Sequence, residues 1–180
     1  MDIPIRFKIY LFWKILFSKK KESPQTKITK EGKGVKSVLF FLPEKKEHAK
    51  VINYFVKVEN PLSNYKIGLI CSDKSKSFYP HVDNVSLYTY DDNDLNYFRT
   101  IKSANLLNEI KTKRYDAIVD LNTNFCAASS MLFFDLDAPL KVGFDSLINI
   151  KICTITLERN KNTFLEIYFS RILNLLGLRF

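Results

Sequence analysis

The segment from Tyr115 to Phe144 constrains the fold of this chain more than any other part of the sequence. A short apolar run from Asp116 to Leu121 is followed by a polar loop, an apolar helical stretch from Phe125 to Phe134, and a second apolar run from Lys141 to Phe144. Continuous apolar runs are typical of strands that are buried on both faces, and a helix that joins two such strands makes them parallel. We therefore expect one β-loop-α-β unit of an α/β sheet here.

The same alternation continues through most of the chain. Apolar runs predict strands at Val35 to Leu42, Lys66 to Cys71, Val85 to Tyr90 and Ile148 to Ile155. Helical spacing predicts helices at Lys46 to Val58, Thr100 to Lys113 and Thr163 to Leu176. Gly177 follows the last helix as a stop signal, and Gly143 is expected to allow a tight exit from its strand. The pattern predicts one α/β domain over residues 35–180, with a parallel sheet and helices on both of its faces.

The positive charge of the chain is concentrated at its N-terminus. Of the formal net charge of +9, residues 1–36 carry +7, which leaves only +2 for the rest. A domain that binds nucleic acid carries its basic patch on the folded surface that meets the phosphates. We therefore expect no nucleic-acid partner and assign the charge to an N-terminal leader.

Residues 1–18 form the first part of this leader, and residues 19–34 read as a polar linker. The apolar stretch is too short, and too interrupted by basic residues, to span a bilayer, and it lacks the cleavage site of a signal peptide. We expect an amphipathic helix in a membrane interface. The alternative is that it packs on the domain or on another chain, because its apolar residues surround the helix. The residues expected to bind the membrane are Trp13, Lys14, Lys19, Lys20 and Lys21.

The cysteines and histidines offer little for metal binding. Cys71, Cys126 and Cys153 are far apart, odd in number and in or beside apolar segments, so we expect buried free thiols in a reducing compartment. There are only two histidines and no Cys-x-x-Cys motif. We predict no structural metal and no cofactor.

A polar rim follows the strand that ends near Leu121. Ligands of doubly wound sheets bind beyond the carboxyl ends of the strands. Asp120 lies near that end, and Asn122, Thr123 and Asn124 follow it. These residues either contact a ligand or serve only to cap the loop and the next helix. Below, the rim means Asp120 and Asn122 to Asn124.

Several segments together resemble a known family. They are Lys36-Ser-Val-Leu-Phe-Phe-Leu-Pro, Tyr65-Lys-Ile-Gly-Leu-Ile, His81-Val-Asp-Asn-Val, Tyr115-Asp-Ala-Ile-Val-Asp-Leu-Asn-Thr-Asn, Ala138-Pro-Leu-Lys-Val-Gly-Phe and the final helix from Phe164. In order and spacing they resemble the N-terminal half of glycosyltransferase family 9, the heptosyltransferases of lipopolysaccharide synthesis. The resemblance covers Lys36 to Leu178.

The resemblance implies a Rossmann-like domain, the N-terminal half of a GT-B fold. In that family this half receives a lipid-linked saccharide acceptor at the inner face of the cytoplasmic membrane, and a second domain holds the nucleotide-sugar donor. The chain is thus expected to be a cytoplasmic, peripheral acceptor-side domain whose rim meets sugar hydroxyls. It reaches Phe180 without a donor domain, so a separate chain would have to supply one.

One turn departs from the family pattern. The family has a turn resembling Arg-x-Ser-x-Leu-Gly-Asp after the first strand, in which the Asp is the proposed general base. The corresponding positions here hold Leu42, Glu47 and His48. His48 is a candidate proton acceptor, or else a solvated surface residue. We expect the isolated chain not to catalyse transfer; the alternative function is a non-catalytic binding or scaffolding module at the membrane surface.

Overall fold

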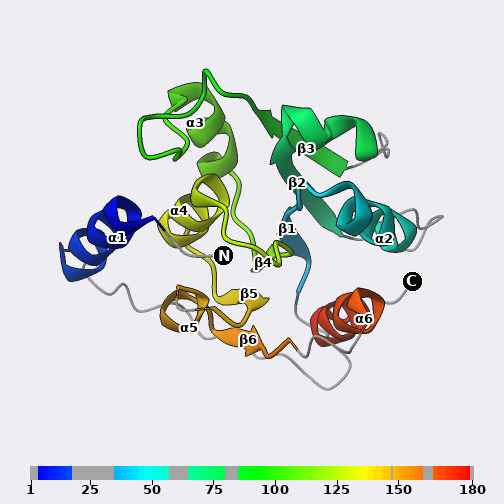
Figure 1. Cartoon of the computed structure of the whole chain (residues 1–180). Coiled ribbons are helices and arrows are strands. Elements are labelled where there is room, and N and C mark those ends of the chain that lie inside the picture. The colour runs from blue at the N-terminus through cyan, green and yellow to red at the C-terminus, as the bar shows by residue number, and fades with distance from the viewer. Residues whose placement is uncertain are drawn as a thin grey trace.

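Six strands form one parallel sheet in the order β3-β2-β1-β4-β5-β6 (Figure 1). The computed structural model describes residues 4–17, 35–56, 65–79, 85–146, 148–159 and 164–178. The strands are β1 (Ser37–Phe41), β2 (Lys66–Ser72), β3 (Val85–Tyr90), β4 (Ala117–Asp120), β5 (Leu140–Phe144) and β6 (Ile155–Leu157). This order is that of a doubly wound sheet, in which the chain changes direction between the two central strands, β1 and β4. The expected Rossmann-like α/β fold is confirmed.

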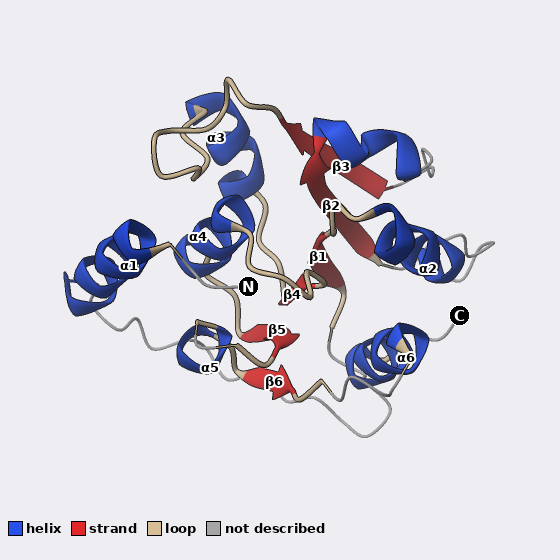
Figure 2. Ribbon diagram, viewed as in Figure 1, coloured by secondary structure: helices blue, strands red, loops and turns tan. Residues whose placement is uncertain are grey.

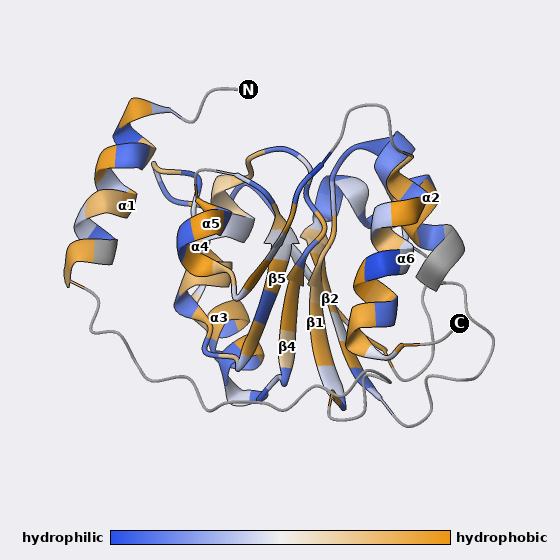
Figure 3. Ribbon diagram, turned by 90° about the horizontal axis from the view of Figure 1, so that it is seen from below, coloured by the Kyte–Doolittle hydropathy of each residue, from blue (hydrophilic) through white to orange (hydrophobic). Residues whose placement is uncertain are grey.

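Helices cover both faces of the sheet (Figures 2 and 3). They are α1 (Ile5–Phe17), α2 (Lys46–Val56), the 3-10 helix η2 (Asp73–Phe78), α3 (Ala104–Thr112), α4 (Ala127–Asp135), α5 (Asn149–Ile152) and α6 (Leu165–Leu176). Helices α2 and α6 lie on one face, and α3, α4 and α5 lie on the other. Two apolar cores, one on each face, therefore enclose the sheet.

Strand β1 shows why its sequence is a continuous apolar run. Side chains alternate between the faces of a strand. Val38 and Phe40 enter the core beneath α2 and α6, whereas Leu39 and Phe41 enter the core beneath α3 and α4. The Phe41 ring meets the Phe133 ring of α4 with centroids 5.8 Å apart. No position of β1 faces water, so every position is apolar or small.

The final helix ends where the sequence predicts. Gly177 has a φ of 72°, a left-handed conformation that glycine adopts without a Cβ clash. The Leu178 amide donates to the Leu173 carbonyl at 2.9 Å, which closes the helix end in a Schellman-like turn. Leu178 is buried beyond this turn and anchors it to the core.

The prediction of a strand from Ile148 to Ile155 is wrong. The structure has the short helix α5 there, followed by β6. Ile148, which directly precedes α5, and Ile152 lie one helical turn apart, and both pack in the cluster that contains α1 residues. The Asn149 side-chain amide donates to the Phe144 carbonyl at 2.8 Å, which fixes the first turn. Contacts with distant segments thus override the alternating local pattern.

Helix α3 begins at Ala104, later than the expected Thr100. Residues 95–101 form a closed loop instead, in which Leu95 and Ile101 make an isolated antiparallel bridge. The Asn96 side-chain oxygen accepts from the amides of Phe98 at 2.9 Å and Thr100 at 3.1 Å, so a side chain offers this segment a hydrogen-bonded alternative to a helix. Within α3, Ile110 is buried, whereas Ala104 is exposed.

Helix α1 packs on the domain through one face. Phe7 and Leu11, one turn apart, are buried in a cluster with Met131 and Ile148. The opposite face of α1 exposes Ile5, Ile9, Phe12, Trp13, Leu16 and Phe17. Packing on the domain, one of the two alternatives, is therefore observed, and a role at a membrane stays a prediction. Among the described residues, no helix combines the length and the apolarity needed to cross a bilayer.

Substitution of Gly143 tests the packing around α5. Gly143 lies within β5 and not at a strand exit, and a Cβ there would come within 2.9 Å of Asn149 Nδ2 and 3.1 Å of Cys153 Sγ. We expect Gly143→Ala to lower the free energy of unfolding by about 1–3 kcal/mol, because the overpacked neighbours must move. Chemical denaturation measures this change, with Thr156→Ala on the neighbouring strand as the control. Equal stability of the glycine variant and wild type would contradict this account.

Candidate functional site

The candidate site lies where β1 and β4 end side by side. Phe41 and Asp120, the last residues of the two strands, are paired in the parallel ladder. Residues 42–45, which follow β1, and residues 121–126, which follow β4, therefore leave the sheet next to one another. A doubly wound sheet binds its ligands at this crossing point, because the two connections run to opposite faces and leave a crevice between them.

His48 and Thr123 meet across this crossing point. His48 lies in the first turn of α2, and its Nδ1 is 3.2 Å from Thr123 Oγ1. Burial lowers the pKa of His48, and the positive charges of Lys45 and Arg159 lower it further. His48 is therefore uncharged at neutral pH. The sequence singled out both residues, and the structure brings them together.

The direction of this hydrogen bond decides what His48 can do. If Nδ1 donates to the threonine oxygen, Nε2 carries the lone pair and can accept a proton from a ligand hydroxyl. If the threonine donates to Nδ1, the ring has used its acceptor and Nε2 can only donate. The same pair can thus serve either as a weak base or as a hydrogen-bond donor to an oxygen.

Asp120 lies beneath the other residues of the rim and does not form its exposed surface. It is 4% exposed, and burial raises the pKa of its carboxyl group to about 6. Its Oδ1 accepts from the backbone amide of Asn122 at 3.0 Å and from the Asn122 side-chain amide at 2.8 Å. Asn122 and Thr123 are half-buried above it, and Asn124 is exposed. A ligand would therefore meet Asn122 to Asn124, which Asp120 holds in place.

The sequence did not reveal two tyrosines that shape the turn after β1. Tyr79 donates to the Pro43 carbonyl at 2.7 Å. Tyr90, the last residue of β3, donates to Glu44 Oε1 at 3.4 Å and lies 3.7 Å from Cys126 Sγ. The positions of these tyrosines, at or beyond strand ends, could have indicated that they lie near the site. Aromatic residues in apolar segments, however, are usually predicted to belong to the core.

The cysteines are free thiols, and only Cys71 is fully buried. Burial and, to a smaller extent, the nearby Asp120 carboxylate raise the pKa of Cys153 to about 12. Burial likewise raises the pKa of Cys71 to about 11. Neither thiol ionises at neutral pH, so neither is suited to act as a nucleophile. Within the described ranges, no three His, Cys, Asp or Glu residues gather as a metal site would require.

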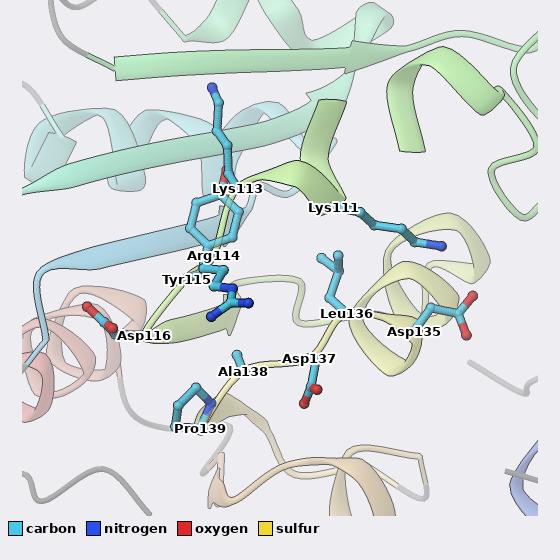
Figure 4. A pocket seen from close by; sticks show the side chains of 10 residues that line it. All are labelled: Lys111, Lys113, Arg114, Tyr115, Asp116, Asp135, Leu136, Asp137, Ala138 and Pro139. Carbon is cyan, nitrogen blue, oxygen red and sulfur yellow. The ribbon is translucent and has the colours of Figure 1, made fainter. Parts of the chain in front are cut away.

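A cleft of about 570 Å³ lies at the opposite, amino edge of the sheet (Figure 4). Its walls are Lys111 and residues 113–116, which lead into β4, and residues 135–139, which lead into β5. Its carboxylates already have structural partners: Asp116 accepts from the backbone amides of Lys36 and Ser37, and Asp135 pairs with Lys14. We therefore place the candidate site at the carboxyl edge, where the topology and the polar rim coincide.

The structure places two of the five residues expected to bind a membrane. Trp13 is exposed on the outer face of α1. The Lys14 ammonium turns toward the domain, where it pairs with Asp135 at 2.6 Å. Lys19, Lys20 and Lys21 lie outside the described residues.

Asp120→Asn tests the buried carboxylate. The folded pKa of Asp120 is raised from 3.8 to about 6, so the native state binds more protons than the unfolded state between these values. Asp120 thus makes its full contribution to stability only below about pH 4, and that contribution is lost as the pH rises through 6. An asparagine keeps an acceptor for Asn122 without the charge. We expect the variant to be about 1–3 kcal/mol more stable than wild type at pH 8, with the gain shrinking toward pH 4.

Chemical denaturation of both proteins at several pH values measures this difference. The comparison cancels the other titrating groups, because only residue 120 changes. A gain that is independent of pH, or a loss at pH 8, would contradict the buried charge.

Comparison with known proteins supports the Rossmann-like α/β fold. The sequence matches no model of a known protein family, and it matches no curated protein sequence. The structure is similar to the crystal structure of the glycosyl transferase family 9 from Veillonella parvula DSM 2008, with a TM-score of 0.59 and 18% sequence identity. The match covers 81% of this chain and 42% of that one. At this identity the likeness establishes the fold: this chain has a Rossmann-like α/β domain of the kind found in that protein.

Proposed function

We propose that this chain is the acceptor-side domain of a glycosyltransferase of the family 9 type. The observation that carries the proposal is the polar rim at the crossing of β1 and β4, which the pair formed by His48 and Thr123 closes from the α2 side. Hydroxyl and amide groups in a row are suited to the hydroxyls of a saccharide. The likeness to a glycosyl transferase family 9 structure supports the same class of ligand.

The proposed acceptor is the saccharide part of a lipid-linked glycan, such as a lipopolysaccharide core. Asn122, Thr123 and Asn124 would contact its hydroxyls, and Asp120 would hold Asn122 in position. His48 would face the reacting hydroxyl through Nε2 when Nδ1 donates to Thr123.

We propose that the chain alone does not transfer sugar. The pKa of His48 is lowered, so His48 is a weaker base than an ordinary histidine. Glu47 stands where the resembling family has a glycine, and its side chain adds bulk to the turn. The donor would be held by a separate domain or chain, since the match spans less than half of the similar protein.

We also propose that α1 binds the inner face of the cytoplasmic membrane. Ile5, Ile9, Phe12, Trp13 and Leu16 recur at helical spacing and are all exposed, so they form a continuous apolar stripe. Such a stripe enters the boundary between headgroups and acyl chains. The lysines at 19–21 would meet anionic lipid. This stripe also favours the second candidate function, a non-catalytic scaffolding module at the membrane surface.

Oligosaccharide titration tests the rim. A lipid-free core oligosaccharide of lipopolysaccharide should shift the imidazole NMR signals of His48, and a His81→Gln variant assigns them, because the chain has only two histidines. We expect Asn124→Ala to weaken binding about 3- to 10-fold, as the loss of one hydrogen bond predicts. Asn108→Ala, an exposed asparagine on α3, is the matched control. No binding, with vesicle binding retained, would favour the scaffolding function, and transfer from a nucleotide-activated heptose by the chain alone would contradict its proposed inactivity.

Vesicle binding tests the stripe. Trp13 is the only tryptophan and is 54% exposed, so its fluorescence should shift to shorter wavelength with vesicles that contain phosphatidylglycerol. Phe12→Ser should weaken binding about tenfold or more, because a large apolar side chain no longer enters the lipid. Phe164→Ser, an exposed phenylalanine beside α6, is the control. A Trp13 emission wavelength that does not change with vesicles would contradict the membrane role. So would sedimentation showing that the chain self-associates through this stripe.

A further inference from the structure

Helix α1 contacts segments that follow three different strands of the sheet. Beyond β3, the Phe98 ring stacks on Tyr10 with centroids 4.9 Å apart. Beyond β4, the Phe125 ring meets Phe7 edge to face at 4.8 Å. Beyond β5, Ile148 packs in the same buried cluster as Phe7. One helix thus braces the carboxyl edge, and Figure 1 shows it beside α4 and α5.

Phe7 is the centre of this arrangement. It is 2% exposed, although it belongs to a helix at one side of the domain. Its partner Phe125 directly follows Asn124, the last residue of the rim. The conformation of residues 122–124 is held from one end by Asp120, through its bonds to Asn122, and from the other end by the contact of Phe125 with α1.

We propose that α1 is a clamp that holds the carboxyl-edge loops in place, and that Phe7 is a positioning residue that acts on the rim through Phe125. The consequence for saccharide binding rests on the proposed function, whereas the clamp itself does not. This role differs from that of a detachable anchor, because α1 is then part of the site's architecture.

The clamp and the apolar stripe use different faces of α1. Phe7, Tyr10, Leu11 and Lys14 face the domain, whereas the stripe faces outward. A helix that left the domain would expose Phe7 and Leu11 and also uncover Met131 and Ile148. Docked on the domain, α1 can bury one face in protein and present the other to lipid, so membrane binding does not require the clamp to open.

Two phenylalanines of α1 provide a matched pair for the test. Phe7 is buried, whereas Phe12, on the other face, is 62% exposed. Hydrogen exchange of residues 121–126 should be at least about tenfold faster in Phe7→Ala, because the loop loses its contact, and unchanged in Phe12→Ala. Amides of β1 and β2 should exchange as in wild type, which shows that the sheet stays folded. Phe7→Leu, which keeps most of the buried apolar volume, should restore most of the protection.

Tyr10→Ala is the second variant. It removes the ring stack on Phe98 and the looser contacts of Tyr10 with Phe7 and Lys14, but it leaves the contact of Phe7 with Phe125 in place. It should speed exchange of residues 95–101 and leave residues 121–126 unchanged. Equal exchange of residues 121–126 in Phe7→Ala and Phe12→Ala would overturn the clamp. So would acceleration spread evenly over the whole domain in Phe7→Ala together with no selective effect of Tyr10→Ala.

Binding of the core oligosaccharide gives the functional readout. We expect Phe7→Ala to weaken it about tenfold, because the binding-competent rim is less populated, and Phe12→Ala to leave it unchanged. If wild type does not bind the oligosaccharide, the proposed function fails, and hydrogen exchange still decides whether the clamp exists. If exchange changes as expected but affinity does not, the rim is not the part of the site that α1 controls, and the positioning role of Phe7 is overturned.

Discussion

The parallel pairing of β1 with β4 is the contact on which the rest of the structure depends. These strands are separated in the chain by β2 and β3, yet they are neighbours at the centre of the sheet. Asp116 closes the pair at the amino end by accepting from the amides of Lys36 and Ser37, and the Leu121 amide donates to the Phe41 carbonyl at the other end. Because the pairing extends beyond both strands, it determines where the two following loops leave the sheet, and hence where a site can form.

Asp120 lowers the stability of the fold but orders the loop at that position. Its neighbours along β4 are apolar and fully buried, and an apolar residue there would avoid the desolvation of a carboxylate. In return, the carboxylate fixes both the backbone and the side chain of Asn122. Buried charges that lower stability but order a polar loop are more typical of binding sites than of cores.

Packing on the domain covers part of the apolar surface of helix α1. A helix with apolar residues around its whole circumference cannot stand alone in water. The domain buries one face with Met131 and Ile148, and the stripe remains for a further surface. Since the buried face also contacts Phe98 and Phe125, the helix is linked to the loops of the candidate site.

Local patterns predicted the strands that are buried on both faces, α2 and the end of α6 at Gly177. They were enough there because the spacing of apolar residues and the conformational freedom of glycine are properties of short segments. They failed at residues 148–155, where Ile-Asn-Ile-Lys-Ile alternates like a strand but contacts with α1 and Phe144 favour a helix. The polar residues of the rim were visible in the sequence, whereas the contact of His48 with Thr123, 75 positions away, was not. The sequence thus determined which segments form elements and which residues are polar at strand ends. The packing of distant segments decided which polar groups meet, because that depends on strand order and helix docking, which no local pattern encodes.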